Sequence, residues 1–300
     1  MERRDFIKTI SGIGLTAFVG PTFIFSKTGK STCEIVVAEG GEPASLVRKA
    51  IESAGGMSRF ISKGDVVVLK PNISWDRVPK QAATTNPEIV AEVIRMCLEA
   101  GAKKVKVFDR TLNEPRRCYE RSGIEKSVKD SGGDIQHVYG PKFRKVRLPE
   151  GELITSWEIY DEVLEADKII NLPIAKHHSL SGVSLAMKNI MGFLGGNRGQ
   201  LHRQFDTKIT DLNAFIRSDL IILDAYRMLL RNGPSGGNLA DVQLKKTVAV
   251  GTDIVAMDSF GASLFHLNPQ EIPFLVKAHA RNLGQNDLNK IDIETIHLAS

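Results

Sequence analysis

From about residue 34 onward, the chain alternates short apolar runs with longer amphipathic stretches. Apolar runs of four or five residues, rich in Val and Ile, are typical of buried strands in a parallel sheet that is covered on both faces. Apolar residues spaced three and four apart are typical of helices packed on such a sheet. We expect strands at residues 34–38, 65–69, 104–108, 168–172, 219–223 and 247–250, and helices at 44–54, 87–100, 157–166, 212–216 and 254–265.

The residues at the ends of one predicted helix support this assignment. Asn86-Pro87-Glu88 combines an N-cap, a proline in the first turn and an early acidic residue, and Gly101 follows the helix. Strands that alternate with helices predict an α/β fold, in which a mostly parallel sheet carries helices on both faces. Residues 31–300 are predicted to form a single α/β domain. The pattern loosens over residues 110–155, where an insertion or a small subdomain is an open alternative.

The first thirty residues follow a different pattern. Arg3 and Arg4 precede Phe6-Ile7-Lys8, and an apolar stretch of 16 residues runs from Ile10 to Phe25. This stretch is shorter than the ~20 apolar residues of a membrane-spanning helix. Together these features resemble a twin-arginine export signal, so we expect residues 1–30 to be a signal segment and the protein to be periplasmic or exported. Because no Ala-x-Ala cleavage motif is present, retention on the membrane by an uncleaved leader stays open.

Composition narrows the classes of function. The chain is 42% hydrophobic and 25% charged, as in ordinary globular proteins. Its net charge of +5 lies partly in the leader, and without a polybasic arm it does not indicate a nucleic-acid binder. Cys33, Cys97 and Cys118 are too far apart for a Cys-x-x-Cys metal site, and their odd number excludes a fully paired disulfide scaffold. Whether Cys97 and Cys118 pair is left open.

Polar side chains follow several of the predicted strands. Ligands of open α/β sheets bind outside the carboxyl ends of the strands, so these residues are the first binding candidates. Lys70 and Asn72 follow the strand at 65–69, where a lysine either reaches solvent or meets an anion. Others either bind a ligand or only cap a loop or helix: Thr85, Asn86, Asp109, Asp224 and Asp253.

The densest cluster of reactive side chains begins where one predicted strand ends. Lys176, His177 and His178 leave this strand together. Such a group can bind an anion, transfer protons near neutral pH or, through His177 and His178, hold a metal. The alternative is a solvated loop with incidental histidines. His202 either belongs to the same loop system or lies on the surface.

The same stretch continues through a predicted helix at 183–187 to Lys188 and Asn189. Three glycines follow that permit close approach of the backbone to a ligand: Gly192, Gly195 and Gly196. We therefore include Lys188 among the candidates for catalysis, and Asn189 and the glycines among those for binding.

Several of these motifs resemble the family called domain of unknown function 362. They are residues 67–72, 85–87, 100–102, 107–109, 172–177, 183–192, 232–234 and 251–258, and the resemblance spans about residues 60–285. It implies an α/β fold with a site at these motifs. Many members carry a ferredoxin-like iron–sulfur segment, which implies a redox association. This chain has no Cys-x-x-Cys, so an iron–sulfur cluster of its own is not expected.

These observations predict an exported protein whose strand-end crevice binds a small anionic ligand or cofactor and performs redox or proton-transfer chemistry on it. Lys70, Lys176 and Lys188 would neutralise the anion, and His177 or His178 would act as acid, base or metal ligand. Because the twin-arginine machinery, an expected partner, exports folded proteins, a metal or preloaded cofactor is an open alternative. The alternative function is a non-catalytic ligand-binding or cofactor-carrying module that acts with a redox or membrane partner protein.

Overall fold

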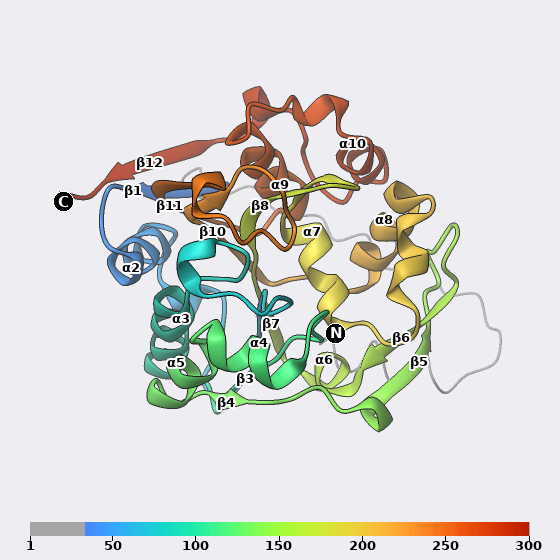
Figure 1. The fold of residues 1–300 in the computed structure, drawn as a ribbon, viewed down its shortest axis with the longest axis horizontal. Helices are drawn as coiled ribbons and strands as arrows, with labels where there is room; N and C mark the ends of the chain where they lie inside the picture. The colour runs from blue at the N-terminus through green and yellow to red at the C-terminus, as the bar shows by residue number, and fades with distance from the viewer. Residues whose placement is uncertain (1–33, 300) are drawn as a thin grey trace.

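The computed structural model describes residues 34–299, so the predicted signal segment and Cys33 lie outside the described residues. A ten-stranded sheet crosses the molecule in the order β12-β1-β11-β10-β7-β2-β3-β4, with β8 paired to β10 and β9 paired to β8 (Figure 1). The strands of this sheet are β1 (Ile35–Glu39), β2 (Val66–Pro71), β3 (Lys104–Val107), β4 (Asp134–Ile135), β7 (Lys168–Leu172), β8 (Ile174–His178), β9 (Gly182–Ser184), β10 (Leu220–Leu229), β11 (Val242–Gly251) and β12 (Ile293–His297).

Most neighbouring strands of this sheet are parallel, and three pairs are antiparallel. Strand β11 is antiparallel to both β1 and β10, and β9 is antiparallel to β8. The predicted α/β fold with a mostly parallel sheet is therefore confirmed. A separate two-stranded sheet pairs β5 (Phe143–Arg147) with β6 (Ser156–Tyr160).

Helices cover both faces of the large sheet, and each face has its own hydrophobic core. Alternation along β2 shows the reason, because Val67 and Leu69 point into one core and Val68 into the other. On the first face lie α2 (Pro43–Ser53), α3 (Pro87–Glu99), α4 (Pro115–Arg121) and α5 (Ile124–Asp130). On the second lie α6 (Asp161–Glu165), α7 (Ala186–Asn189), α8 (Phe205–Phe215), α9 (Ile254–Ser263) and α10 (Pro273–Ala280).

Two of the predicted helices are wrong in part. Residues 157–160 belong to β6, and the helix begins only at Asp161. Val183 and Ser184 lie in β9, and α7 begins at Ala186. In both places the backbone pairs with a strand, β5 or β8, that local spacing of apolar residues does not reveal.

Strands β10 and β11 each contain ten residues, so they extend well beyond the predicted 219–223 and 247–250. They pair with each other along most of their length, and this pairing continues β10 past its apolar run and lets β11 begin before its own apolar run. Cys97 and Cys118 are buried and carry free thiols, which answers the question of their pairing. From residue 34 to residue 299, no helix is both long and apolar enough to cross a membrane.

Candidate functional site

Lys70 and Asp109 form a buried ion pair where two adjacent strands end. Strands β2 and β3 are parallel neighbours, so the residues that follow them meet at the same edge of the sheet. The Nζ of Lys70 lies 3.0 Å from Oδ1 of Asp109, and both side chains are almost fully enclosed. Burial lowers the pKa of Lys70, and the Asp109 carboxylate opposes this shift. The charge of Lys70 is therefore already matched within the protein.

Gly192 is the residue that lets this ion pair fit against the chain. A Cβ at position 192 would lie 1.8 Å from Oδ1 of Asp109 and 2.5 Å from Cε of Lys70. The backbone of Gly192 also accepts a hydrogen bond from the Arg110 N–H. A side chain at this position would force Asp109 or Lys70 to move, so the glycine serves close packing around the ion pair.

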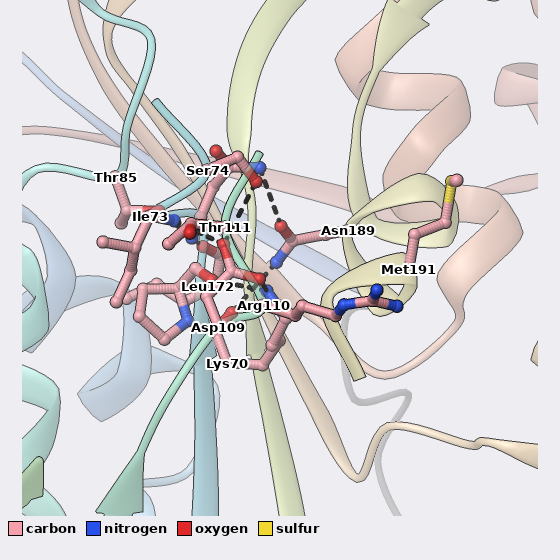
Figure 2. A network of polar contacts seen from close by, with 12 residues as sticks. Lys70, Ile73, Ser74, Thr85, Asp109, Arg110, Thr111, Leu172, Asn189 and Met191 are labelled. Atoms are coloured by element: carbon pink, nitrogen blue, oxygen red, sulfur yellow. Dashed lines mark hydrogen bonds and ion pairs between the residues drawn. The ribbon is translucent and has the colours of Figure 1, made fainter. Parts of the chain in front are cut away.

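A ladder of side-chain amides joins the ends of β2 and β7 to α7. Figure 2 shows its members Lys70, Thr85, Leu172 and Asn189. Asn189 donates from Nδ2 to the Lys70 carbonyl and to Oδ1 of Asn171, at 2.9 Å each. Asn72 in turn donates to Oδ1 of Asn189. Thr85 accepts from the Asn72 N–H and donates to the Leu172 carbonyl. Because all these partners are buried, the ladder fixes the strand ends relative to one another.

Lys176 extends from β8 into the same region. Its Nζ donates to Oδ1 of Asn72 at 3.1 Å and to the carbonyl of Ala83 at 2.6 Å. Burial lowers its pKa to about 7, although Asp109 acts in the opposite direction. Lys176 can thus gain or lose a proton near neutral pH.

Lys188 lies in α7 and contacts His202. Its Nζ is 3.1 Å from Nε2 of His202, and it lies over the ring of Phe205 at 4.6 Å from the centroid. Burial lowers the pKa of Lys188 to about 7. Asp258 holds the start of α7, because its carboxylate accepts from the backbone N–H groups of Ala186 and Met187.

The two histidines of β8 point in opposite directions, as alternation along a strand requires. His178 lies on the same side as Lys176 and stacks on His202 with ring centroids 5.9 Å apart. Its Nδ1 accepts from the backbone N–H of Leu180, so Nε2 carries the proton. Burial and the Lys188 charge lower the pKa of His178 to about 3, which keeps the ring neutral. His177 instead accepts from the N–H of Gly233 on the other side.

Lys176, His178, Lys188 and His202 line a cavity of about 140 Å³. Arg198 also lines it, and its guanidinium donates to the carbonyls of Arg110, Thr111 and Met191. The cavity is lined by Asn72, Ser74, Trp75, Leu112, Lys176, His178, Ser184, Lys188, Asn189, Met191, Gly192, Arg198, Gly199, His202 and Pro234. Among these described residues there are three basic side chains and two imidazoles, but no carboxylate.

Other predicted site residues lie outside this lining. Asn86 caps α3 through Oδ1, and its N–H donates to Asp224. Asp224 lies within β10 rather than after it, and burial raises its pKa to about 6. Gly195 and Gly196 line a neighbouring cavity of about 470 Å³, together with Arg110.

Asp253 lies at the opposite edge of the sheet. Strand β11 is antiparallel to its neighbours, and its last residue, Gly251, pairs with Ile221 at the start of β10. The residue that follows β11 is therefore at the amino ends of the parallel strands. Asp253 caps α9, as predicted, by accepting from the N–H groups of Val255 and Ala256. The structure therefore does not bring Asp253 together with Lys70 and Lys176.

In residues 34–299, no group of three or more His, Cys, Asp or Glu side chains is arranged so that it could hold a metal ion. The described residues therefore give no support to metal binding by the protein alone. His177 and His178 face opposite sides of β8, and the other histidine beside His178 is His202.

Sequence reasoning did not select Arg198, Trp75 or Ser184, and it left His202 undecided. All four line the cavity. Arg198 and His202 lie in a polar segment after Gly196 that has no apolar periodicity, so the sequence does not indicate where their side chains point. One local signal does indicate a functional segment here. It is a basic residue and a histidine four positions apart, shortly after a glycine cluster.

Comparison with known proteins adds a family context. Thylakoid-associated protein sll1697 from Synechocystis sp. is 27% identical to this chain over 256 residues, which cover 83% of this chain and 77% of that protein. The lactate racemase apoprotein from Thermoanaerobacterium thermosaccharolyticum superposes with a TM-score of 0.47 at 11% identity, over 79% of this chain and 58% of that chain. A protein from Thermotoga maritima gives 0.42 at 9% identity, over 75% and 60%. This chain thus spans about three fifths of the length of each of the two solved structures.

The chain also matches a sequence family over most of its length. The profile described as Domain of unknown function (DUF362) covers residues 67–263. This region includes Lys70, Lys176 and Lys188 and the strands that position them. The chain belongs to the DUF362 family.

Proposed function

We propose that this protein binds a small organic anion in the cavity between Lys176, Lys188 and Arg198 and transfers a proton to or from it. The observation that carries the proposal is the charge of the cavity lining. The described residues that line the cavity include three basic side chains and no carboxylate. Buried cationic groups are costly unless an anion compensates them. A carboxylate or phosphate group in the cavity would supply that compensation.

The lining also suggests how a bound anion would be oriented. His178 directs its Nε2–H away from the backbone groups that hold Nδ1, so it can donate a hydrogen bond to the ligand. The Lys188 and His202 pair can exchange a proton, because their nitrogens lie 3.1 Å apart. Lys70 takes no direct part, since Asp109 already neutralises it.

Intrinsic fluorescence offers a test of binding, because one of the two tryptophans, Trp75, lines the cavity. In a Trp157→Phe variant, the remaining signal comes from Trp75. We expect malonate, pyruvate or inorganic phosphate to change this signal saturably. A Lys188→Met substitution in the same background should weaken binding, and an exposed control, Lys80→Met, should not. Unchanged fluorescence and no heat of binding with any of these anions would overturn the proposal.

Proton transfer needs a separate measurement. In deuterated buffer, we expect the protein to accelerate exchange of the carbon-bound protons of a bound carboxylate, followed by NMR. His202→Gln should slow this exchange by about 100-fold while binding persists. Binding without accelerated exchange would rule out the proton-transfer part and identify a ligand-binding or cofactor-carrying module. Mass spectrometry and elemental analysis of the purified full-length protein would detect a retained cofactor or metal.

We also propose that the protein is exported and stays associated with a membrane. The support is the Arg3-Arg4 pair before an apolar run, together with a relative whose name places that protein at the thylakoid. Residues 1–33 fused to a reporter should direct it out of the cytoplasm, and Arg3→Lys with Arg4→Lys should prevent this. Export of the doubly substituted fusion would contradict the assignment.

A further inference from the structure

The Lys188 amine occupies an unusual environment for a buried lysine. Its nearest polar partner is Nε2 of His202, and Sδ of Met191 is the other atom within reach, at 3.7 Å. In the part of the chain that the structure describes, no carboxylate forms a salt bridge with Lys188. The side chain is about nine-tenths buried, yet it lines the cavity.

His202 is oriented so that it can take a proton from this amine. Its Nδ1 faces the carbonyl of Gly199, and because a carbonyl can only accept, Nδ1 carries the hydrogen. The lone pair of Nε2 is then directed at Nζ of Lys188. Lys188 and His202 both line the cavity.

The other two lysines of the region are held differently. Nζ of Lys176 donates to two oxygen atoms, and Nζ of Lys70 donates to the carbonyl of Pro71 and pairs with Asp109. Oxygen acceptors and carboxylates stabilise the protonated form. Of the three lysines, Lys188 alone has a nitrogen base as its closest partner.

We propose that Lys188 is a nucleophile that forms an imine with the carbonyl group of a small oxo acid held in the cavity. This inference rests on the proposed anion binding, because Lys176 and Arg198 would hold the carboxylate while Lys188 meets the carbonyl carbon. A lysine in a desolvated pocket beside other cations is the setting in which an amine becomes reactive near neutral pH. The lowered pKa of Lys188 is consistent with this setting.

Formation of the imine needs only the oxo acid and groups of this chain, and atoms and charge balance. The lone pair of the neutral Nζ attacks the carbonyl carbon, and the C–N bond forms as the π electrons move to oxygen. His202 Nε2 accepts a proton from the nitrogen and returns it to the oxygen, which gives a carbinolamine. The nitrogen then gives up its second proton to His202 Nε2, which passes a proton to the hydroxyl group. That group leaves as water while the nitrogen lone pair forms the C=N bond, which gives the imine. No oxidant or reductant is required.

Reductive trapping tests the proposal on the full chain. The protein is incubated near neutral pH with pyruvate and sodium cyanoborohydride, which reduces imines to stable secondary amines. Peptide mapping by mass spectrometry then locates the adduct. We expect one dominant adduct on Lys188, and this adduct should be lost in Lys188→Arg. Lys208 lies near the same segment, where it donates to the Gln200 carbonyl, and the control variant Lys208→Arg should retain the adduct. His202→Gln should slow formation of the adduct by about 100-fold.

Propionate, which has the carboxylate but no ketone, separates the two proposals. Propionate should compete with pyruvate and form no adduct. Binding of both acids without enrichment of an adduct at Lys188 over surface lysines would overturn the imine and leave anion binding intact. Failure of both acids to bind would overturn both. The adduct site in the unsubstituted protein decides the matter even if Lys188→Arg does not fold.

Discussion

Gly192 and Asp109 lie so close that a single added methyl group cannot fit between them: a Cβ on Gly192 would lie 1.8 Å from Oδ1 of Asp109. The same carboxylate oxygen pairs with Lys70. The turn after α7 is thus packed directly against the ion pair at the ends of β2 and β3. This contact connects the segment that carries Lys188 to the sheet.

Replacing Gly192 by Ala should destabilise the fold. The added methyl group must displace Asp109 or Lys70, and overpacking of this kind costs about 1–3 kcal/mol. Urea denaturation measures the loss. Gly140→Ala is the matched control, because a Cβ there meets no atom within 4 Å. Equal stability of the two variants would show that the turn can move away from the ion pair.

Asp109→Asn should destabilise the protein more strongly. It leaves Lys70 buried without a compensating charge, and breaking one side of such a pair costs about 3–5 kcal/mol. The double variant Lys70→Met, Asp109→Asn should recover part of this loss, because it removes both charges. Thermal and urea unfolding of the two single variants and the double variant give the coupling. Strictly additive losses would mean that the two groups do not stabilise each other.

Anion binding should weaken as the pH rises. Burial lowers the pKa values of Lys176 and Lys188 to about 7, so both lose positive charge above neutrality. An anion binds the protonated form, and each pH unit above the pKa then costs about tenfold in affinity for one linked proton. Calorimetry in buffers of different ionisation enthalpy should show proton uptake on binding near neutral pH. A constant affinity from about pH 6 to about pH 9 would contradict this linkage.

Asp258→Asn tests the anchoring of α7. The carboxylate accepts two backbone N–H groups, and an amide can accept at only one of its two atoms, so we expect a loss of about 1–3 kcal/mol. Burial raises the pKa of Asp258 to about 7, above its unfolded value of about 3.9. The wild type therefore loses stability as the pH rises from about 4 to about 7, whereas Asn does not titrate. The deficit of the variant should shrink over this range, and a deficit that grows would contradict the raised pKa.

Asp253→Ala should affect stability but not anion affinity. The side chain caps α9 and also accepts from the Gln285 N–H, and loss of an N-cap costs about 0.5–2 kcal/mol. Asp253 lies at the opposite edge of the sheet from Lys176, so Trp75 fluorescence titrations should be unchanged. A tenfold loss of affinity in a folded variant would return Asp253 to the list of ligand-binding residues.

The sequence predicted the parts of the fold that depend on neighbouring residues. The apolar runs of β2, β3 and β7 and the cap of α3 at Asn86 lie where local patterns placed them. Prediction was weaker at β6, where the backbone is held by β5: the paired residues are between 9 positions apart (Arg147 and Ser156) and 17 positions apart (Phe143 and Tyr160). Such pairing stabilises a strand through hydrogen bonds to a distant segment, and the spacing of apolar residues within the strand carries no record of it.

For the candidate site, the sequence by itself determined the residue types and the rule that groups them. Lys70 and Asn72 at the end of β2 lie close to Asp109 after β3, because parallel strands end at one edge of a sheet. Lys176 lies within β8, a strand that the sequence analysis did not predict. Only the tertiary structure decided the direction of β11, which separates Asp253 from the site, and the approach of His202 to Lys188. Both depend on how distant segments pack, because strand direction and side-chain contact are set by the whole core rather than by the residues on either side.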